Sequence, residues 1–132
     1  MPVRTGQAQK RVLYVVDSDA SVREGLSRLA ESEGFEPMPC EGAEAFLREA
    51  DTRNAVCALI DLSDIGLRKP EVRARLSVVA SRLPVIALSV RDDAQTQRTA
   101  RALGARAFFR KPVDATALFD SIEWVMREIK QR

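Results

Sequence analysis

The chain has 132 residues, which suits one domain with one core, and 45% of them are hydrophobic, too many for a wholly disordered chain. Acidic and basic residues are interleaved at a formal net charge of +2, and without a continuous basic stripe we expect no direct nucleic-acid binding. Histidine is absent from the sequence, which excludes histidine-ligated zinc, a Ser-His-Asp triad and a phosphohistidine within this chain.

The chain begins with a polar segment that lacks the apolar core of a signal peptide. We therefore expect a flexible N-terminal tail at residues 1–10 and one domain at residues 11–132. No apolar run reaches the roughly 18 residues that a membrane-spanning helix needs, so we expect no membrane partner and a cytoplasmic location. Cys40 and Cys57 lie in short apolar segments, which indicates buried, reduced thiols rather than a disulfide.

The first part of the predicted domain reads as strand, helix, strand, helix. Arg11–Val16 is an apolar run rich in β-branched residues, typical of a strand that is buried on both faces. Ser21–Glu33 has apolar residues at helical spacing, and Gly34 is suited to end that helix. Glu36–Cys40 is a weaker strand whose two prolines suit the edge of a sheet, and Gly42–Glu49 is a short helix.

Further strand–helix units follow in the same order. The predicted elements are strand Val56–Ile60, helix Glu71–Leu83, strand Pro84–Leu88, helix Asp92–Leu103, strand Ala107–Phe109 and a final helix from Asp114 to Lys130. Gly104 is suited to end the helix Asp92–Leu103, and Asp114 is suited to cap the start of the final helix.

This strict alternation with short connections predicts an α/β fold, a doubly wound five-stranded parallel sheet with helices on both faces. In such a sheet, the crevice for a ligand lies outside the carboxyl ends of the strands. Four polar residues follow or close these strands, namely Asp17, Asp61, Ser89 and Lys111. We therefore expect their side chains to converge at one edge of the sheet.

Two carboxylates at one edge repel each other and stay ionised together only if a cation lies between them. Lys111 is one such cation, and Mg²⁺, which prefers carboxylate oxygens, is another. A carboxylate can also attack a phosphoryl group as a nucleophile, a reaction that depends on positioning, a cation and a hydroxyl. Asp61, Asp17, Ser89 and Lys111 can fill those roles.

A simpler interpretation exists for each acid. Asp17 and Asp19 both precede a predicted helix, and either can cap it; we assign the cap to Asp19 and the site to Asp17. Asp61 alone reads as a loop acid, and it becomes a site residue only in the company of Ser89 and Lys111.

Four motifs in combination, YVVDSDASVRE, ALIDLSD, PVIALSV and GARAFFRKP, make the sequence similar to the receiver domain of bacterial two-component response regulators. The resemblance covers nearly the whole chain, from Arg11 to Lys130. It implies a flavodoxin-like sheet with strand order 2-1-3-4-5. It also implies a signalling module, rather than an enzyme, that accepts a phosphoryl group from a histidine kinase.

By matching position, the resemblance makes Asp61 the phosphoacceptor and places Asp17, Asp61 itself and the backbone carbonyl of Ser63 around a Mg²⁺ ion. The family usually carries a second acid directly after the first, where this chain has Ser18, and Asp19 is a further candidate ligand. A hydroxyl in place of a carboxylate removes one formal charge from the site, so we expect Mg²⁺ to bind weakly or not at all.

The resemblance also implies a conformational switch. Ser89 would be the switch hydroxyl, Phe108 the aromatic rotamer switch, and Lys111 the phosphate-contacting lysine, with a cis peptide bond before Pro112. Packing in a short strand is the simpler interpretation of Phe108.

The last predicted helix carries the single tryptophan of the chain away from its apolar stripe. At about 100° per residue, Leu118, Ile122, Val125 and Ile129 share one face, and Trp124 lies nearly opposite. An exposed tryptophan is either a harmless surface ring or the anchor of an interface. The interface interpretation predicts a partner contact, for example a homodimer through the last helix.

The sequence therefore supports two functional interpretations. In the first, a sensor histidine kinase or another phosphodonor phosphorylates Asp61, and a partner-binding face switches. In the second, the chain is a degenerate receiver that acts as a phosphorylation-independent interaction or dimerisation module, and Ser18 is the feature that favours it. A small α/β enzyme or nucleotide-binding protein ranks last, because no glycine-rich phosphate loop follows the first strand.

Overall fold

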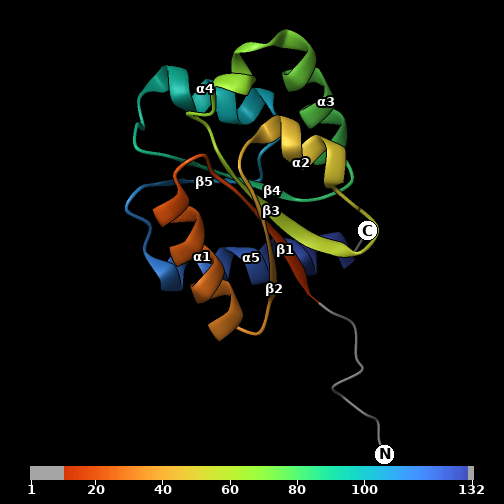
Figure 1. Cartoon of the computed structure of the whole chain (residues 1–132), viewed down its shortest axis with the longest axis vertical. Coiled ribbons are helices and arrows are strands. Elements are labelled where there is room, and N and C mark those ends of the chain that lie inside the picture. The colour runs from red at the N-terminus through yellow and green to blue at the C-terminus, as the bar shows by residue number, and fades with distance from the viewer. Residues whose placement is uncertain (1–10, 131–132) are drawn as a thin grey trace, which may run out of the picture.

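The computed structural model describes residues 11–130, which contain one five-stranded parallel sheet in the order β2-β1-β3-β4-β5 (Figure 1). This order confirms the predicted doubly wound, flavodoxin-like α/β fold. The tail predicted at residues 1–10 lies outside the described residues.

Strands and helices alternate along the described chain. The strands are β1 Val12–Val16, β2 Glu36–Cys40, β3 Ala55–Asp61, β4 Val85–Ser89 and β5 Ala107–Arg110. The helices are α1 Ala20–Ser32, α2 Ala43–Glu49, α3 Pro70–Ala80, α4 Ala94–Ala102 and α5 Ala115–Lys130, with a short 3₁₀ helix Ile65–Arg68 before α3.

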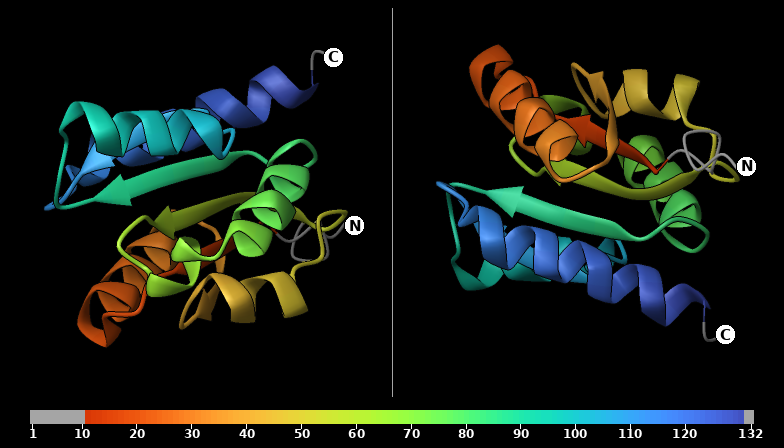
Figure 2. Two further views of the ribbon diagram at one scale, coloured as in Figure 1. Left: turned by 90° about the horizontal axis from the view of Figure 1, so that it is seen from above. Right: turned by 90° about the horizontal axis from the view of Figure 1, so that it is seen from below.

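Helices cover both faces of the sheet, with α1 and α5 on one face and α2, α3 and α4 on the other (Figures 1 and 2). Along β1, Leu13 and Val15 pack with the α1 and α5 core, whereas Tyr14 and Val16 pack with the opposite core. Burial of such a side chain contributes about 1.5–3 kcal/mol. The apolar run in β1 is continuous because both faces of the strand are covered.

Two helix caps predicted from the sequence are confirmed. Asp19 caps α1, where its carboxylate accepts a hydrogen bond from the Ser21 N–H at 2.9 Å. Asp114 caps α5 and accepts a bond from the Thr116 N–H at 3.0 Å. Gly34 follows α1 with a φ of +89°, a left-handed conformation that favours glycine.

The third helix lies nearer the N-terminus than the predicted range Glu71–Leu83. It begins at Pro70 and ends at Ala80. Proline is suited to the first turn, because an N–H group at that position makes no hydrogen bond within the helix. Leu83 is buried but lies beyond the helix in a bend. Its apolar character reflects burial in the core rather than helical periodicity.

Both cysteines are free and buried, as the sequence predicts. Burial raises the pKa of the Cys40 thiol to about 11, with help from nearby Glu49, and it raises the pKa of Cys57 to about 12. Both thiols are therefore protonated and unreactive at neutral pH. Among residues 11–130, no helix is long and apolar enough to cross a membrane.

Candidate acidic site at the carboxyl edge of the sheet

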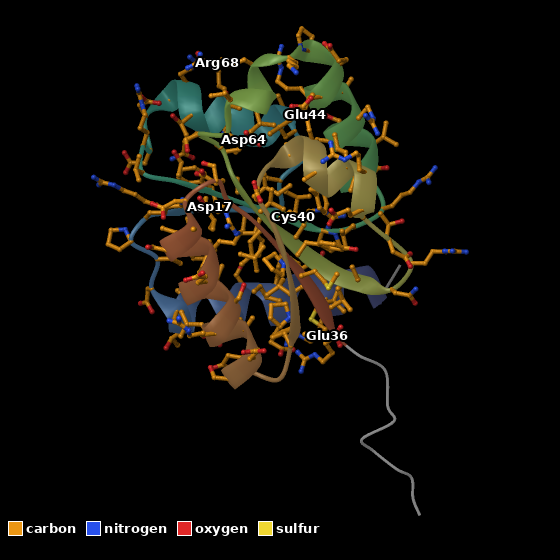
Figure 3. The ribbon with its side chains drawn as sticks, viewed as in Figure 1. Asp17, Glu36, Cys40, Glu44, Asp64 and Arg68 are labelled. Carbon is orange, nitrogen blue, oxygen red and sulfur yellow. The ribbon has the colours of Figure 1, made fainter. Side chains whose placement is uncertain are left out.

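The predicted polar residues do converge at the carboxyl edge of the sheet. Asp17 follows β1, Asp61 closes β3, Ser89 closes β4, and Lys111 follows β5. Figure 3 shows Asp17 at the end of the sheet opposite Glu36, the residue that begins β2. Asp17 is 1% exposed and Asp61 is 2% exposed, so both carboxylates need partners inside the protein.

Lys111 supplies a cation to both acids. Its Nζ lies 2.6 Å from Asp17 Oδ2 and 3.2 Å from Asp61 Oδ1. Burial alone would lower the pKa of Lys111, but the hydrogen bond to Asp17 and the charge of Asp61 outweigh that effect and raise it. The ammonium group is therefore fully charged at neutral pH and lies between the two carboxylates.

Backbone bonds hold Lys111 in this place. Its N–H donates to the Ser89 carbonyl oxygen at 2.8 Å, which extends the β4–β5 pairing by one residue. The Lys111–Pro112 peptide bond is cis, as the resemblance implied.

Backbone and hydroxyl donors take up the remaining carboxylate oxygens. Asp17 Oδ1 accepts from the Asp19 N–H at 2.9 Å. Asp61 Oδ2 accepts from the Ser63 hydroxyl at 2.6 Å, and Asp61 Oδ1 lies 3.4 Å from the Ser63 N–H. The sequence pointed to the carbonyl of Ser63 and missed its hydroxyl. A serine two residues after an acid is the local signal for such a bond.

The two residues predicted to act as a switch differ in environment. Ser89 is buried, and its hydroxyl oxygen accepts from the Arg91 N–H at 3.0 Å. Phe108 is half-buried on β5, and it belongs to neither of the two buried core clusters of the described residues. Their roles in switching stay predictions.

Asp64 is a residue that the sequence reasoning missed. Its carboxylate accepts bonds from the Ala43 N–H, at the start of α2, and from the Gly66 N–H at 3.0 Å. Gly42 has no side chain to cap α2, and a Cβ there would lie 3.0 Å from Asp64 Oδ2. Asp64 therefore ties the loop after Asp61 to α2, and Figure 3 shows it beside Glu44 of that helix.

The comparison with protein families identifies the domain. The family model that matches is the response regulator receiver domain, over residues 13–123. The transcriptional regulatory protein FixJ of Bradyrhizobium diazoefficiens is 30% identical over 116 residues, which are 88% of this chain and 57% of FixJ. The transcriptional regulatory protein TdiR of Thauera aromatica is 31% identical over 119 residues, which are 90% of this chain and 52% of TdiR. The chain thus spans about half the length of these relatives.

Solved structures agree with the sequence relatives. A response regulator receiver protein from Burkholderia phymatum is 32% identical with a TM-score of 0.73, over 89% of this chain and 95% of that one. The response regulator StyR is 32% identical with a TM-score of 0.76, over 92% of this chain and 63% of StyR.

The fold and the pairing of two buried acids with a lysine define a signalling domain of the two-component type. The chain belongs to the response regulator receiver domain family. Receiver domains accept phosphoryl groups, and they bind Mg²⁺ in an acidic pocket.

The acidic pocket of this chain has one acid fewer than the family pattern. Ser18 is exposed and puts a hydroxyl where the family has an acid, and Asp19 is engaged as the cap of α1. Among residues 11–130, no three His, Cys, Asp or Glu side chains converge to hold a metal ion. Lys111 already neutralises part of the charge of Asp17 and Asp61. This donor set is poorer than the ligand shell that Mg²⁺ prefers.

Proposed function

We propose that the chain is a cytoplasmic receiver that accepts a phosphoryl group on Asp61 from a sensor histidine kinase or a small-molecule phosphodonor. The observation that supports this proposal is the pairing of a buried Asp61 carboxylate with the Lys111 ammonium at 3.2 Å. The free, buried thiols of Cys40 and Cys57 support a reducing compartment.

The transfer itself asks little of the protein beyond positioning and charge. A carboxylate oxygen of Asp61 attacks phosphorus, a new oxygen–phosphorus bond forms, and the donor leaves with the electron pair of the bond that breaks. The product is an acyl phosphate on the protein's own side chain. We therefore assign a signalling role rather than an enzymatic one. Lys111 is placed to stabilise the negative charge that the phosphoryl oxygens bring.

The same bonds suggest how modification would change the fold. A phosphoryl group on Asp61 Oδ2 would add charge and acceptor oxygens near Lys111 and would displace the Ser63 hydroxyl from that oxygen. Ser89 can reach those oxygens only if its hydroxyl rotates away from the Arg91 N–H. That movement would alter the loop that leads into α4 and with it the face formed by α4, β5 and α5.

An apolar hollow beside the acidic site suits the docking of a phosphodonor protein. It has a volume of about 260 Å³ and lies between α1 and the segment after β5. The lining includes Val22, Leu29, Lys111, Pro112 and Val113. A protein that reaches Asp61 past Lys111 would cover these apolar groups, which are otherwise in contact with water.

The second partner that we propose is another copy of this chain, bound through α5. Trp124 is 51% exposed, whereas Leu118, Ile122 and Val125 on the other side of the helix are buried. This exposure agrees with the helix phase predicted from the sequence, and tryptophan is enriched among residues that dominate binding energy.

The test is treatment with acetyl phosphate and Mg²⁺, read by intact mass. Wild type should gain one phosphoryl group and Asp61→Asn should gain none. Asp92→Asn, which alters an exposed acid beyond Ser89, is the matched control and should behave as wild type. Equal modification of wild type and Asp61→Asn would refute the assignment of the acceptor.

A specific observation favours the second function, a degenerate receiver that binds partners without phosphorylation. Ser18 removes an acid from the pocket, while Lys111 already bridges the two acids that are left. Under this alternative, no donor modifies the wild type, and Asp61→Asn leaves partner binding unchanged. Modification of wild type by acetyl phosphate at a measurable rate would contradict it.

A further inference from the structure

Helix α1 carries an arginine that bonds to the backbone of a site residue. Arg23, the fourth residue of α1, is half-buried, and its Nη1 donates a hydrogen bond to the Asp17 carbonyl oxygen at 2.7 Å. Among residues 11–130, no other group donates a hydrogen bond to that oxygen. The peptide group between Asp17 and Ser18 therefore depends on Arg23 for the hydrogen bond at its carbonyl end.

Asp17 is held at each of its polar groups. Its N–H donates to the Cys40 carbonyl oxygen at 3.1 Å, and its own carbonyl accepts from Arg23. Its carboxylate accepts from the Asp19 N–H at 2.9 Å and from Lys111 Nζ at 2.6 Å. The two backbone bonds fix the point from which this buried carboxylate projects, and the carboxylate in turn holds Lys111.

Lys111 lies closer to Asp17 than to Asp61. Its Nζ is 2.6 Å from Asp17 Oδ2 but 3.2 Å from Asp61 Oδ1. Burial lowers the pKa of Lys111, and the hydrogen bond to Asp17 is the largest of the effects that raise it. Asp17 is thus the main anchor of the ammonium group, and a displacement of Asp17 would change the position of that group relative to Asp61.

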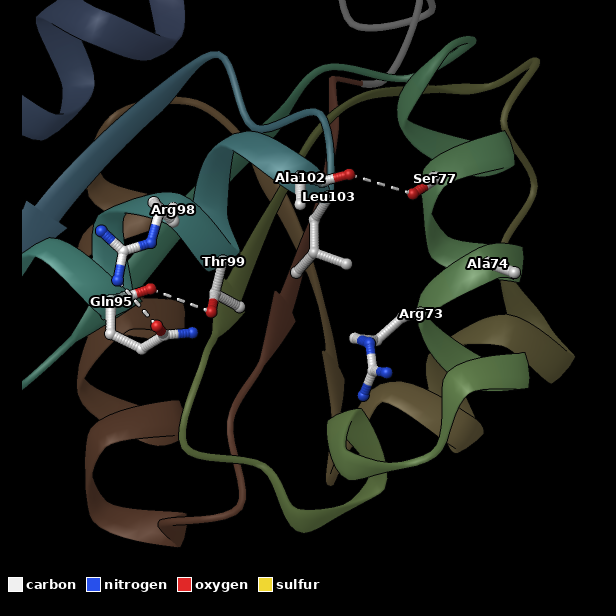
Figure 4. A pocket seen from close by; sticks show the side chains of 8 residues that line it. All are labelled: Arg73, Ala74, Ser77, Gln95, Arg98, Thr99, Ala102 and Leu103. Carbon is white, nitrogen blue, oxygen red and sulfur yellow. Dashed lines mark hydrogen bonds between the residues drawn. The ribbon is translucent and has the colours of Figure 1, made fainter.

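The loop that follows Asp61 contains a bond of the same kind without a site acid at its end. Arg73 is the fourth residue of α3, beside the groove between α3 and α4 (Figure 4), and its Nη1 donates to the Leu67 carbonyl oxygen at 2.7 Å. Arg23 and Arg73 each reach back six residues along the chain. Leu67 has an apolar side chain that cannot bond to Lys111. Arg73 is therefore a matched comparison for Arg23.

We propose that Arg23 is a positioning residue for phosphoryl transfer to Asp61, which acts through the backbone of Asp17 to keep the Lys111 ammonium group in place. This role rests on the proposed function, the phosphorylation of Asp61. Without Arg23, the peptide group between Asp17 and Ser18 is free to rotate, the Asp17 carboxylate shifts, and Lys111 follows it. Misplacement of a group by about 1 Å can lower a rate by a factor of about 100.

The first experiment measures how firmly Lys111 is held, in the unphosphorylated chain without metal or phosphodonor. NMR of the chain with ¹⁵N-labelled lysine follows the exchange of the Lys111 ammonium protons with water. We expect slow exchange in wild type and exchange about tenfold faster in Arg23→Gln. A nearby positive charge attracts the hydroxide ion that catalyses exchange, so loss of the Arg23 charge alone would slow it. Faster exchange therefore reports the displacement of Asp17.

Two control variants should exchange as wild type does. Arg73→Gln loses a bond of the same length to a loop carbonyl, so a loss of stability alone would affect Arg23→Gln and Arg73→Gln alike. Arg28→Gln removes an exposed arginine from the same helix as Arg23. Equal exchange of Lys111 in Arg23→Gln and in either control would overturn the proposal.

The second experiment measures the rate at which acetyl phosphate with Mg²⁺ modifies Asp61, read by intact mass. The rate should fall about tenfold in Arg23→Gln and stay near the wild-type value in Arg73→Gln and Arg28→Gln. Equal rates in wild type and Arg23→Gln would overturn the role of Arg23 and leave the proposed function intact. If wild type gains no phosphoryl group, the proposed function fails, and the role of Arg23 in the transfer fails with it, whereas the exchange of Lys111 still shows whether Arg23 holds Asp17 in place.

Discussion

Replacement of Lys111 by methionine is the sharpest test of the acidic site. Methionine keeps much of the length and volume of the lysine stem but removes the ammonium group between Asp17 and Asp61. The two carboxylates are 1% and 2% exposed, so water cannot easily replace the lost partner. In the variant, two buried like charges face each other without a cation.

The size of the effect follows from the distances. At an effective dielectric constant of about 20, unit charges about 3 Å apart attract by roughly 5 kcal/mol, and desolvation of the three groups offsets much of this attraction. Removal of one partner from a buried ion pair costs about 3–5 kcal/mol. The Lys111 side chain retains 12% exposure, which favours the lower end. We expect a loss of about 3 kcal/mol, or a melting temperature lower by about 10 °C.

Urea unfolding followed by circular dichroism measures this loss, and its pH dependence gives a second check. The pKa of Lys111 is raised in the folded chain above the ordinary value of 10.5. The stability that Lys111 contributes is therefore fully present below pH 10.5 and is lost as the pH rises through the raised value. The difference between wild type and Lys111→Met should accordingly shrink in strong alkali.

The matched control is Lys69→Met. Lys69 lies 3.1 Å from Glu44, but both side chains are about half exposed, so the expected loss is below about 1 kcal/mol. If Lys111→Met cost no more than Lys69→Met at pH 7, the ammonium group would not be what stabilises the two buried acids, and the reasoning would fail.

Three further predictions concern other parts of the domain. Ser18→Asp should tighten Mg²⁺ binding by about 1–2 kcal/mol in calorimetry, because it restores a carboxylate to the pocket. Unchanged affinity would mean that Ser18 does not limit Mg²⁺ binding. Asp64→Ala should lower the free energy of unfolding in urea by about 1–2 kcal/mol, since the N–H groups of Ala43 and Gly66 lose their acceptor; no loss would show that water replaces it. Trp124 emission should be red-shifted in dilute solution and shift to the blue at high concentration if α5 forms a dimer, and Trp124→Ala should abolish that change while the fold is kept. A blue emission at every concentration would contradict the exposed position.

Much of the fold follows from local signals in the sequence. A strand covered on both faces must be apolar throughout, and Val12–Val16 has that pattern. The caps at Asp19 and Asp114 and the left-handed Gly34 depend only on neighbouring backbone groups, so they too were predictable. The grouping of the four site residues follows from topology, because the carboxyl ends of parallel strands meet at one edge.

Other features depend on contacts that no local pattern encodes. The 3₁₀ helix Ile65–Arg68 has too few residues for a periodic signal, and Leu83 looks helical only because the core buries it. The groove between α3 and α4 exists because of how these two helices are spaced over the sheet, which their separate sequences do not reveal.

The sequence by itself determined the α/β order, the strand ends and the residue types of the acidic site. Only the tertiary structure decided that one ammonium group lies within 3.2 Å of both acids, that the Ser63 hydroxyl covers Asp61, and that Asp64 caps α2. The physical reason is the separation along the sequence between the groups that interact. Helix and strand preferences arise between near neighbours, whereas the bond from Lys111 to Asp17 spans 94 residues and forms only when packing sets the distance between strand ends.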